Sequence, residues 1–441
     1  MSDDRRERAV PRGRISRLSR FGRMAGGVAG GMLSEGARRL AAGERPKLSD
    51  LALTPGNMTR VADQLSQLRG AAMKLGQMIS MDTGDMLPPE LTEILGRVRD
   101  RAYHMPPKQL KHVLAAEWGE NWRGRFALFQ PSPIAAASIG QVHRARLPDG
   151  RELAIKVQYP GVAESIDADV DNVATLLRVS GVLPKTLNIT PMLTEAKRQL
   201  HQEADYIREG AQMERFRAAL ADDERFVVPA LEPDLTTPRV LAMTFEEGRP
   251  IESLVDAPQD ERDRVTKTII DLVLLELFIF GFMQTDPNFA NYRYQPESGR
   301  IVLLDFGAAG DVSADTAARY ANMLRAGLGG EREELKAAAL AAGFFSETIV
   351  QRHGDFLNRA LDLIIAELNR PGPFDFGDRA FVKVLRQEGM EVAADRQAWH
   401  LPPVDTVFVQ RKISGTALLG ARLKAKVDVR SMVADTLGSA D

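Results

Sequence analysis

The sequence predicts an α+β fold of two lobes, a small β-rich lobe followed by a larger helical one, with a helical extension in front. Three observations support this. Alternating residues on both sides of a Pro-Asp-Gly turn at 148–150 predict a β-hairpin. The apolar run from Thr268 to Met283 predicts a buried helix. The stretch from about residue 315 onward has helical patterning broken at proline pairs. The expected parts are a basic, flexible leader at 1–45, a helical extension at 46–120, the β-rich lobe at 121–247 and the helical lobe at 248–441.

The composition limits the class of protein. Of the 441 residues, 44% are hydrophobic and 27% are charged, as in globular proteins with a sizeable core. The net charge of −2 gives no argument for nucleic acid, so no such partner is expected. Because there is no cysteine, disulfides, thiolate metal sites and cysteine nucleophiles are excluded. Asp271 and Glu276 interrupt the apolar run, which is too short and too charged to span a bilayer.

The leader is strongly basic. Between Met1 and Met24 there are eight arginines and three acids, followed by a Gly/Ala-rich segment. This pattern is typical of a transit peptide, of a membrane-surface anchor, or of a basic tail that docks on its own protein. All three interpretations stay open.

The extension after the leader is predicted to be helical. Residues 57–81 carry one apolar stripe at spacings of three and four. Its members are Val61, Leu65, Leu68, Ala72, Leu75 and Ile79. Lys74 and Gln77 are three apart and therefore share a face beside this stripe. Pro88-Pro89 ends the region, and Pro106-Pro107 opens a later helix.

The β-rich lobe has a strand lysine and a loop in front of it. Lys156 lies in the second strand of the predicted hairpin, Glu152 to Val157. The loop before the hairpin contains Ala135, Ala136, Ala137 and Ser138. This is the layout in which a loop covers the phosphates of a nucleotide and a lysine grips them, except that alanines replace the usual glycines. Each alanine Cβ restricts positive φ and limits how closely the backbone can approach a phosphate.

Such a lysine needs a carboxylate partner on a neighbouring helix. Residues 191–213 are expected to form one helix, on which Glu203 pairs with Lys156 and Asp205 meets a different group. Glu195 and Glu209 are interpreted as a solvated face. The hinge between the lobes is placed at 245–248, and Glu246 within it is expected to bind the nucleotide.

The helical lobe has the spacing of a catalytic loop and a metal-binding turn. Asn291 follows Asp286 by five positions, and Asp305 of Asp-Phe-Gly follows it by nineteen, after an apolar strand. Asp286 would orient or deprotonate the phosphoryl acceptor, while Asn291 and Asp305 would hold Mg²⁺ on the phosphates. Asp and Asn also mark ordinary turns, and that interpretation is weakened because a strand lysine lies upstream.

A long activation segment is missing from the sequence. Asp305-Phe306-Gly307 is followed almost at once by Ser313, which has the pattern of a helix start. Thr285 stands before Asp286, where a regulated protein kinase has an arginine. A platform for extended peptide substrates is therefore not expected. The isolated histidines, among them His143 and His353, show no metal-ligand spacing and are interpreted as structural.

Six motifs in order resemble the UbiB/AarF family of atypical kinase-like proteins, which is associated with ubiquinone biosynthesis. They are Lys74-Leu75-Gly76-Gln77, the loop 135–138, Lys156, Glu203-Ala204-Asp205-Tyr206, the loop 284–291 and Asp305-Phe306-Gly307. The resemblance implies a protein-kinase-like fold whose extension lies over the active site, with Lys74 and Gln77 entering the nucleotide site and restraining protein phosphorylation. It implies ATP or ADP and Mg²⁺ as ligands, bound between the lobes. Many members carry C-terminal transmembrane segments, and no such segment is evident in this sequence.

Three functions compete. The first is an ATPase or small-molecule kinase in quinone or isoprenoid-lipid metabolism, with a quinone precursor or a lipid as partner. The second is a protein kinase, and the third is a non-enzymatic nucleotide-sensing scaffold for a lipid-modifying complex. The expected location is cytoplasmic, with peripheral membrane contact as an option, or mitochondrial in a eukaryote.

Overall fold

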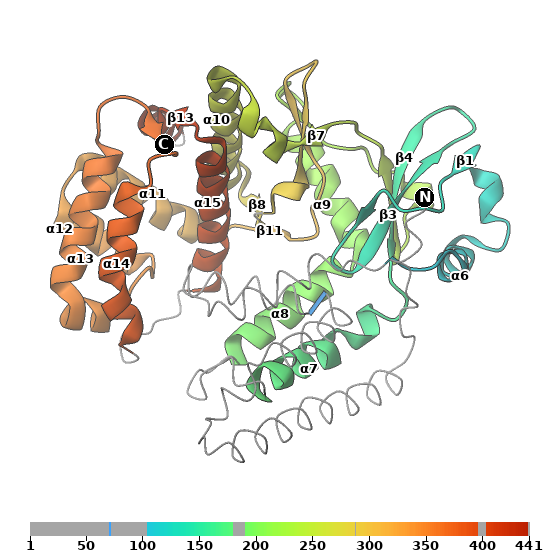
Figure 1. Cartoon of the computed structure of the whole chain (residues 1–441), viewed down its shortest axis with the longest axis horizontal. Helices are drawn as coiled ribbons and strands as arrows, with labels where there is room; N and C mark the ends of the chain where they lie inside the picture. The colour runs from blue at the N-terminus through green and yellow to red at the C-terminus, as the bar shows by residue number, and fades with distance from the viewer. Residues whose placement is uncertain (1–69, 72–103, 180–189, 287, 396–402, 440–441) are drawn as a thin grey trace, which may run out of the picture. The chain divides into compact units, whose positions relative to one another are not determined.

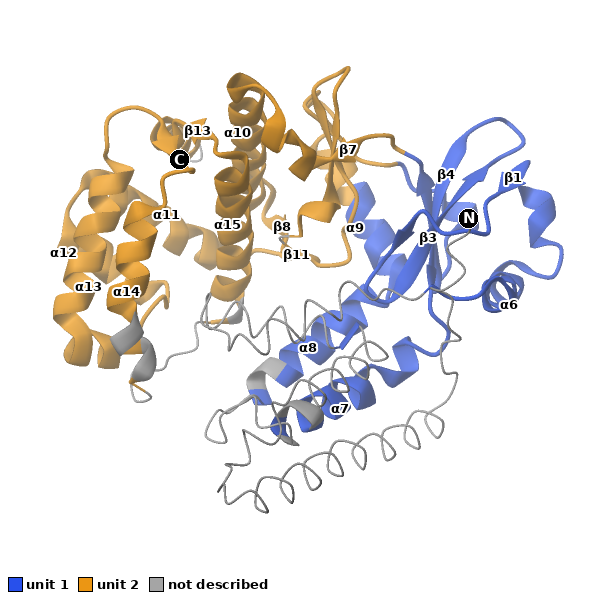
Figure 2. Cartoon of the chain, viewed as in Figure 1, with its two compact units in different colours: residues 1–214, 230–245 blue, residues 215–229, 246–441 orange. Residues whose placement is uncertain are grey.

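The structure, a computed structural model, describes residues 70–71, 104–179, 190–286, 288–395 and 403–439. The chain divides into two compact units (Figure 2). Unit 1 ends at Glu214 and also includes Ala230–Phe245, whereas unit 2 comprises Arg215–Pro229 and everything from Glu246 onward. The helix expected at 57–81 lies outside the described residues except for Gly70 and Ala71, which are helical.

Unit 1 is built on an antiparallel sheet. Its strand order is β1 (Leu128–Phe129), β3 (Gly140–Arg146), β4 (Glu152–Gln158) and β6 (Val240–Thr244), and β2 (Ala135–Ala136) also pairs with β3. The hairpin predicted from the alternating pattern is present, with Gly140 opposite Gln158 and Arg146 opposite Glu152. Because β4 is bordered on both sides by other strands, Lys156 sits at a central position of the sheet.

Helix α6 (Pro107–Trp118) covers the core of unit 1 from outside the sheet. Proline at the first helical position fits there because that residue has no intrahelical hydrogen bond to lose. Leu110, Val113 and Leu114 are buried, as the pattern predicted. They pack with a group of aromatic rings and with the inward-facing strand residues. The indole N–H of Trp118 donates to the carbonyl of Leu235 at 3.0 Å.

Three further helices come after β4 in the chain. They are α7 (Ile166–Val179), α8 (Thr190–Glu203) and α9 (Tyr206–Ala219), and α7 lies against α8 (Figure 1). The prediction of a single helix over 191–213 was wrong, because the helix is interrupted at Ala204-Asp205. The Asp205 side chain accepts a hydrogen bond from the Arg208 N–H at 3.0 Å, so it caps the start of α9.

Unit 2 contains two small sheets. In the larger one the order is β5 (Phe226–Val227), β10 (Arg300–Leu303), β9 (Tyr292–Gln295) and β7 (Arg249–Pro250). The other sheet pairs β8 (Phe282–Gln284) with β11 (Ala309–Asp311). The two sheets frame the loop that runs from Gln284 to Tyr292.

Helices make up the rest of unit 2. Helix α10 (Gln259–Leu275) continues into a π-helix, Glu276–Phe280, and lies beside α15 (Val404–Leu423) (Figure 1). The others are α11 (Ala314–Gly329), α12 (Arg332–Ala341), α13 (Glu347–Leu368), α14 (Ala380–Ala394) and α16 (Val429–Ser439). A short pair, β12 (Phe374–Asp375) and β13 (Lys426–Val427), joins the region after α13 to the segment after α15. Across the described parts of the chain, no helix is long and apolar enough to cross a membrane.

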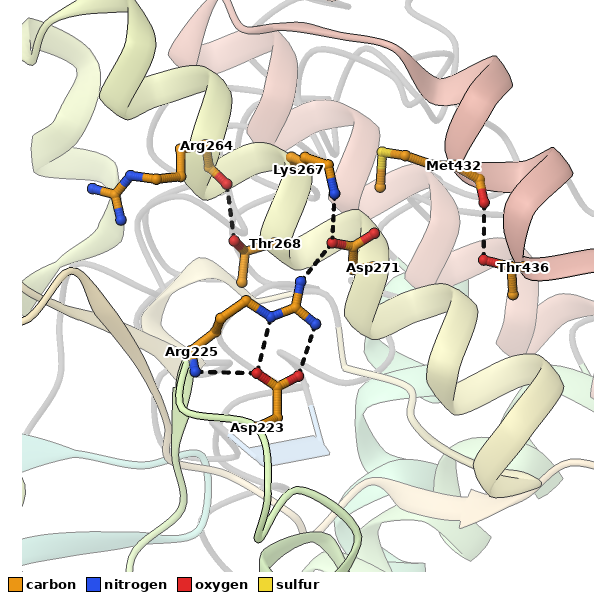
Figure 3. Close-up of polar contacts among 8 residues, drawn as sticks. All are labelled: Asp223, Arg225, Arg264, Lys267, Thr268, Asp271, Met432 and Thr436. Atoms are coloured by element: carbon orange, nitrogen blue, oxygen red, sulfur yellow. Dashed lines mark hydrogen bonds and ion pairs between the residues drawn. The ribbon is translucent and has the colours of Figure 1, made fainter. Parts of the chain in front are cut away.

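An ion-pair cluster attaches the 215–229 segment to α10 (Figure 3). Arg225 binds Asp223 at 2.7 Å and Asp271 of α10 at 2.6 Å, while Lys267 binds Asp271 at 2.9 Å. The Arg225 guanidinium lowers the pKa of the Asp223 carboxyl. The backbone carbonyl of Arg225 also accepts from Ile301 N–H at 2.9 Å, which fixes the parallel pairing of β5 with β10.

Candidate active site

Lys156 is held by a glutamate in unit 1. Its ammonium donates to both carboxylate oxygens of Glu209, at 2.7 and 2.9 Å. The side chains are 10% and 1% exposed, so the pair is almost dry. The ring of Tyr206, which is fully buried, lies 5.1 Å from the ammonium. A two-point contact in a dry site fixes the position of the ammonium far better than an exposed pair would.

The expectation that Glu203 would be the partner of Lys156 was wrong, as was the interpretation of Glu209 as solvated. The physical reason is the break at Asp205, since α9 starts afresh there and turns Glu209 toward the sheet. Glu203 instead accepts a hydrogen bond from the Ser138 hydroxyl at 2.9 Å. The Asp205 cap, a common helix-start signal, could have revealed the break from the sequence.

The alanine-rich loop is extended. Ala135 and Ala136 pair with Val142 and Gln141 on β3, and Ala137 N–H donates to Gly140 at 2.9 Å. None of these alanines has a positive φ. A Cβ on Gly140 would lie 2.5 Å from the Val157 carbonyl oxygen and 2.9 Å from the Tyr206 hydroxyl, so glycine is required there. The loop is thus tied to the strand and the ring that surround Lys156.

The end of this loop also contacts the helical extension. A Cβ on Gly70 would lie 3.0 Å from Ile139 Cγ2 and 3.4 Å from the Ser138 carbonyl oxygen. The extension and the loop therefore approach each other closely at this point. Lys74 and Gln77 are outside the described residues, so their proposed entry into the nucleotide site stays a prediction. Glu246, the first residue of unit 2 after Phe245, is half-buried, and its role also stays a prediction.

In unit 2 the loop between β8 and β9 carries Asp286 and Asn291. The Thr285 hydroxyl donates to the Ala308 carbonyl at 2.7 Å, which anchors the start of the loop. The Asn291 side-chain amide lies 3.5 Å from the backbone oxygen of Asp286, and Asn291 itself is nearly buried. The loop thus brings Asp286 and Asn291 together, as their spacing predicts.

A backbone hydrogen bond places Asp305 close to Asn291. Leu304 N–H donates to the Asn291 carbonyl at 3.0 Å, and one Asp305 carboxylate oxygen accepts from Gly307 N–H at 3.0 Å. Phe306 is buried, and its ring lies 5.1 Å from that of Phe216. The packed ring beside Asp305 fixes this turn to the core of unit 2.

The donor chemistry fits Mg²⁺. Asp305 and Asn291 offer hard oxygen ligands, and Mg²⁺ is commonly held by one or two carboxylates together with substrate phosphates. Within the described ranges, no group of three or more His, Asp or Glu side chains could hold a metal by itself.

A second buried lysine was missed by the sequence analysis. In unit 2, Lys412 of α15 lies 3.1 Å from a carboxylate oxygen of Glu276 and donates to the Tyr292 hydroxyl at 3.0 Å. Burial by itself would lower the pKa of Lys412, but Glu276 and Tyr292 outweigh it and raise that pKa. Burial raises the pKa of Glu276, against the effect of Lys412. Burial also raises the pKa of Tyr292, and the charges of Glu276 and Asp286 add to this.

Comparison with known proteins agrees with these features. A model of the ABC1 atypical kinase-like domain matches residues 97–339. The chain belongs to the ABC1 atypical kinase-like family. This is the UbiB group associated with ubiquinone biosynthesis, which confirms the resemblance seen in the six motifs.

Relatives in this family match nearly the whole chain. The mitochondrial atypical kinase COQ8 of Saccharomyces cerevisiae is 37% identical over 96% of this chain and 85% of its own. The mitochondrial atypical kinase COQ8B of Rattus norvegicus is 37% identical over 99% of this chain and 83% of its own. Among solved structures, the Mycobacterium tuberculosis protein Rv3197, in complex with erythromycin, has a TM-score of 0.60 and 26% identity, covering 85% of this chain and 95% of that one. The predicted kinase-like fold, with a β-sheet region followed by a largely helical region, is confirmed.

Proposed function

We propose that this ABC1-family chain is an ATP-dependent atypical kinase or ATPase that supports ubiquinone or related isoprenoid-lipid metabolism. The observation that carries the proposal is the dry, two-point Lys156–Glu209 pair beside the alanine-rich loop. Burying a lysine in this way costs desolvation free energy. In the proposed function, that cost is offset because the fixed ammonium can bind phosphate oxygens.

The other residues take the roles expected of this fold. Asn291 and Asp305 would hold the Mg²⁺ that accompanies the nucleotide, and that ion would neutralise charge on the phosphates. Asp286 would accept a hydrogen bond from the attacking hydroxyl or water and so orient it. Ser138, tied to Glu203, would place the end of the alanine-rich loop near the phosphates. Glu246 would meet the adenine side of the nucleotide.

The acceptor is proposed to be small, such as a phenolic quinone precursor, or water. Only Ala308 separates Gly307 from β11, and α11 begins at Ala314, so the chain has no long segment there to hold a peptide. Lys74 and Gln77 would further restrain protein phosphorylation. The close approach of Gly70 to Ser138 supports this, because Lys74 comes only four positions later in the chain.

Metal-dependent nucleotide binding is the first test. Asp305→Asn should abolish the rise in melting temperature that Mg²⁺-ADP gives the native protein, because one carboxylate charge on the metal is lost. Asp362→Asn is the matched control, since that side chain is exposed and pairs with Arg332 on the surface. An undiminished shift in Asp305→Asn would overturn the metal assignment.

A measurement of ATP hydrolysis distinguishes an enzyme from a non-enzymatic scaffold. Phosphate release is measured with and without a phenol resembling a quinone precursor and with anionic liposomes, in native protein and in Asp286→Asn. An enzyme should release phosphate, respond to these additions and lose its activity in the variant. A nucleotide-sensing scaffold would bind Mg²⁺-ADP normally yet release no phosphate above background. The cytoplasmic, membrane-peripheral or mitochondrial location stays a prediction.

A further inference from the structure

The Lys412 cluster lies inside unit 2. The Lys412 side chain is 1% exposed and the Glu276 carboxylate 0% exposed. Tyr292 is also buried, and its ring lies 5.6 Å from the Lys412 ammonium. All three side chains are therefore buried in the interior of unit 2.

Each partner of Lys412 is attached to one end of the loop that carries Asp286 and Asn291. Glu276 lies 3.5 Å from the backbone N–H of Gln284, the last residue of β8 before the loop. Tyr292 is the first residue of β9 after the loop, and it pairs with Leu303 of β10 just before Asp305. One ammonium therefore contacts groups at both ends of the 285–291 loop.

Stability alone does not account for such a cluster. Replacing a buried ion pair with well-packed apolar side chains of similar size is often neutral or stabilising. The polar cluster adds a geometric constraint. An ammonium has three N–H donors, and each hydrogen-bond partner must lie along one of them. The two ends of the loop are thereby held at a set separation, which apolar packing would leave looser.

We propose that Lys412 is a positioning residue for the metal site, acting through Glu276 and Tyr292 to hold the 285–291 loop so that Asn291 stays beside Asp305. This rests on the proposed function, since Mg²⁺-nucleotide binding is the property that it tunes. Lys412 itself touches neither the metal nor the substrate.

The main test uses the double variant Lys412→Met/Glu276→Met in the full-length protein, which removes both charges and keeps similar volume. Three quantities are measured: the melting temperature, ADP affinity with and without Mg²⁺, and amide hydrogen exchange of residues 284–292. The double variant should melt within a few degrees of the native protein and bind ADP normally without Mg²⁺. Its Mg²⁺ requirement should rise about tenfold, and exchange in 284–292 should speed up while α12 stays unchanged.

Tyr292→Phe provides a second variant that removes only the hydroxyl and keeps the ring. It should raise the Mg²⁺ requirement about threefold, and this result stands even if the double variant fails to fold. Lys267→Met is the control, because that lysine pairs with Asp271 on the outside of α10 and should change nothing (Figure 3).

The outcomes separate the two proposals. Unchanged Mg²⁺ dependence in both the double variant and Tyr292→Phe would overturn the positioning role while leaving the proposed function intact. If instead the double variant loses ADP affinity equally with and without Mg²⁺, Lys412 is a general structural residue and the inference is also wrong. A native protein that binds no Mg²⁺-nucleotide would overturn the proposed function itself, and the positioning role with it.

Discussion

Two buried lysine–glutamate pairs, one in each unit, differ in geometry and in exposure. Lys156 binds both oxygens of Glu209 at 2.7 and 2.9 Å, and its side chain keeps 10% of its surface exposed. Lys412 lies 3.1 and 3.3 Å from the oxygens of Glu276, shares its charge with a tyrosine hydroxyl and is 1% exposed. The difference in exposure is in the direction that the proposed function requires, since Lys156 would have to meet a ligand and Lys412 would not. If Lys156 binds a nucleotide as proposed, burial alone does not distinguish it from Lys412.

The largest expected effect is on the internal pair. Glu276→Ala leaves the Lys412 ammonium buried with its counter-charge removed, which typically costs about 3–5 kcal/mol. Urea unfolding of this variant, compared with Glu209→Ala in unit 1, measures the difference. Glu209→Ala should cost less, because the Lys156 side chain, at 10% exposed against 1% for Lys412, is nearer to water. Equal losses would contradict the contrast between the two pairs.

His143 extends the comparison to a buried titratable side chain that stays neutral. Burial lowers its pKa to about 4 from 6.5, opposite to the direction for Lys412. The neutral ring donates from Nδ1 to the Gln130 carbonyl at 3.0 Å and accepts at Nε2 from the Gln141 side-chain amide at 2.9 Å. Since the folded pKa is depressed, the stability contribution of His143 is complete above pH 6.5 and is lost as the pH falls toward 4.

The full effect of this titration is about 3 kcal/mol, because each pKa unit corresponds to about 1.4 kcal/mol. Native protein should therefore lose stability between pH 6.5 and 4 more steeply than His143→Gln, which keeps a hydrogen-bonding side chain but cannot titrate. The free energy of unfolding at several pH values gives both slopes, and their difference cancels the carboxylates that titrate in both proteins. Parallel slopes would mean that His143 titrates normally in the folded state.

The Lys156–Glu209 pair, which we propose to face the nucleotide, should affect the affinity for Mg²⁺-ADP. Glu209→Gln removes the charge that orients Lys156 and should weaken Mg²⁺-ADP binding about tenfold or more, because a hydrogen bond to a charged group contributes roughly 1.5–3 kcal/mol. Glu203→Gln is the matched control, since Glu203 contacts Ser138 and should matter less. Isothermal titration of both variants measures how much each acid contributes to nucleotide affinity. A larger loss in Glu203→Gln would mean that the Lys156–Glu209 pair does not set that affinity.

The smallest expected effect is in the alanine-rich loop. Ala136→Gly should cost about 0.5–1 kcal/mol of stability, because glycine loses more backbone freedom on folding. Glycine also allows positive φ, so backbone N–H groups can approach the β- and γ-phosphates more closely and the preference for ATP over ADP should rise. Dissociation constants for both nucleotides measure this ratio. If the ratio stays constant while the melting temperature falls, the alanine serves packing alone.

The sequence predicted those features that depend on neighbours in the chain. The hairpin around Lys156, the Pro107 helix start, and the helix that opens after Ser313 all obey local patterns and are confirmed. Asp286 and Asn291 also come together as their spacing predicts. The order of the six motifs then sufficed to identify the kinase-like fold.

The missed features depend on tertiary contacts. Lys412 lies 136 positions from Glu276 and 120 from Tyr292, and an Arg-Lys pair on a helix normally indicates a solvated face. Nothing near Lys412 in the sequence indicates burial. Glu209 was predicted to be solvated for a different reason. The cap at Asp205 starts a new helix, so Glu209 faces another direction than it would on one continuous helix.

The π-helix at Glu276–Phe280 limits where residues can be deleted from this chain. A π-turn holds one residue more than an α-turn, and Gly281, with φ of +67°, closes it before β8. Removing one residue here would replace the π-turn with an ordinary α-turn and shorten the chain between Glu276 and Gln284, which should disturb the contact between the Glu276 carboxylate and the Gln284 N–H. Substitutions at the exposed Ile279 should be tolerated, whereas single-residue deletions between 276 and 281 should not. The number of residues between Glu276 and the 285–291 loop is therefore constrained by the contacts of Glu276 with Gln284 and Lys412.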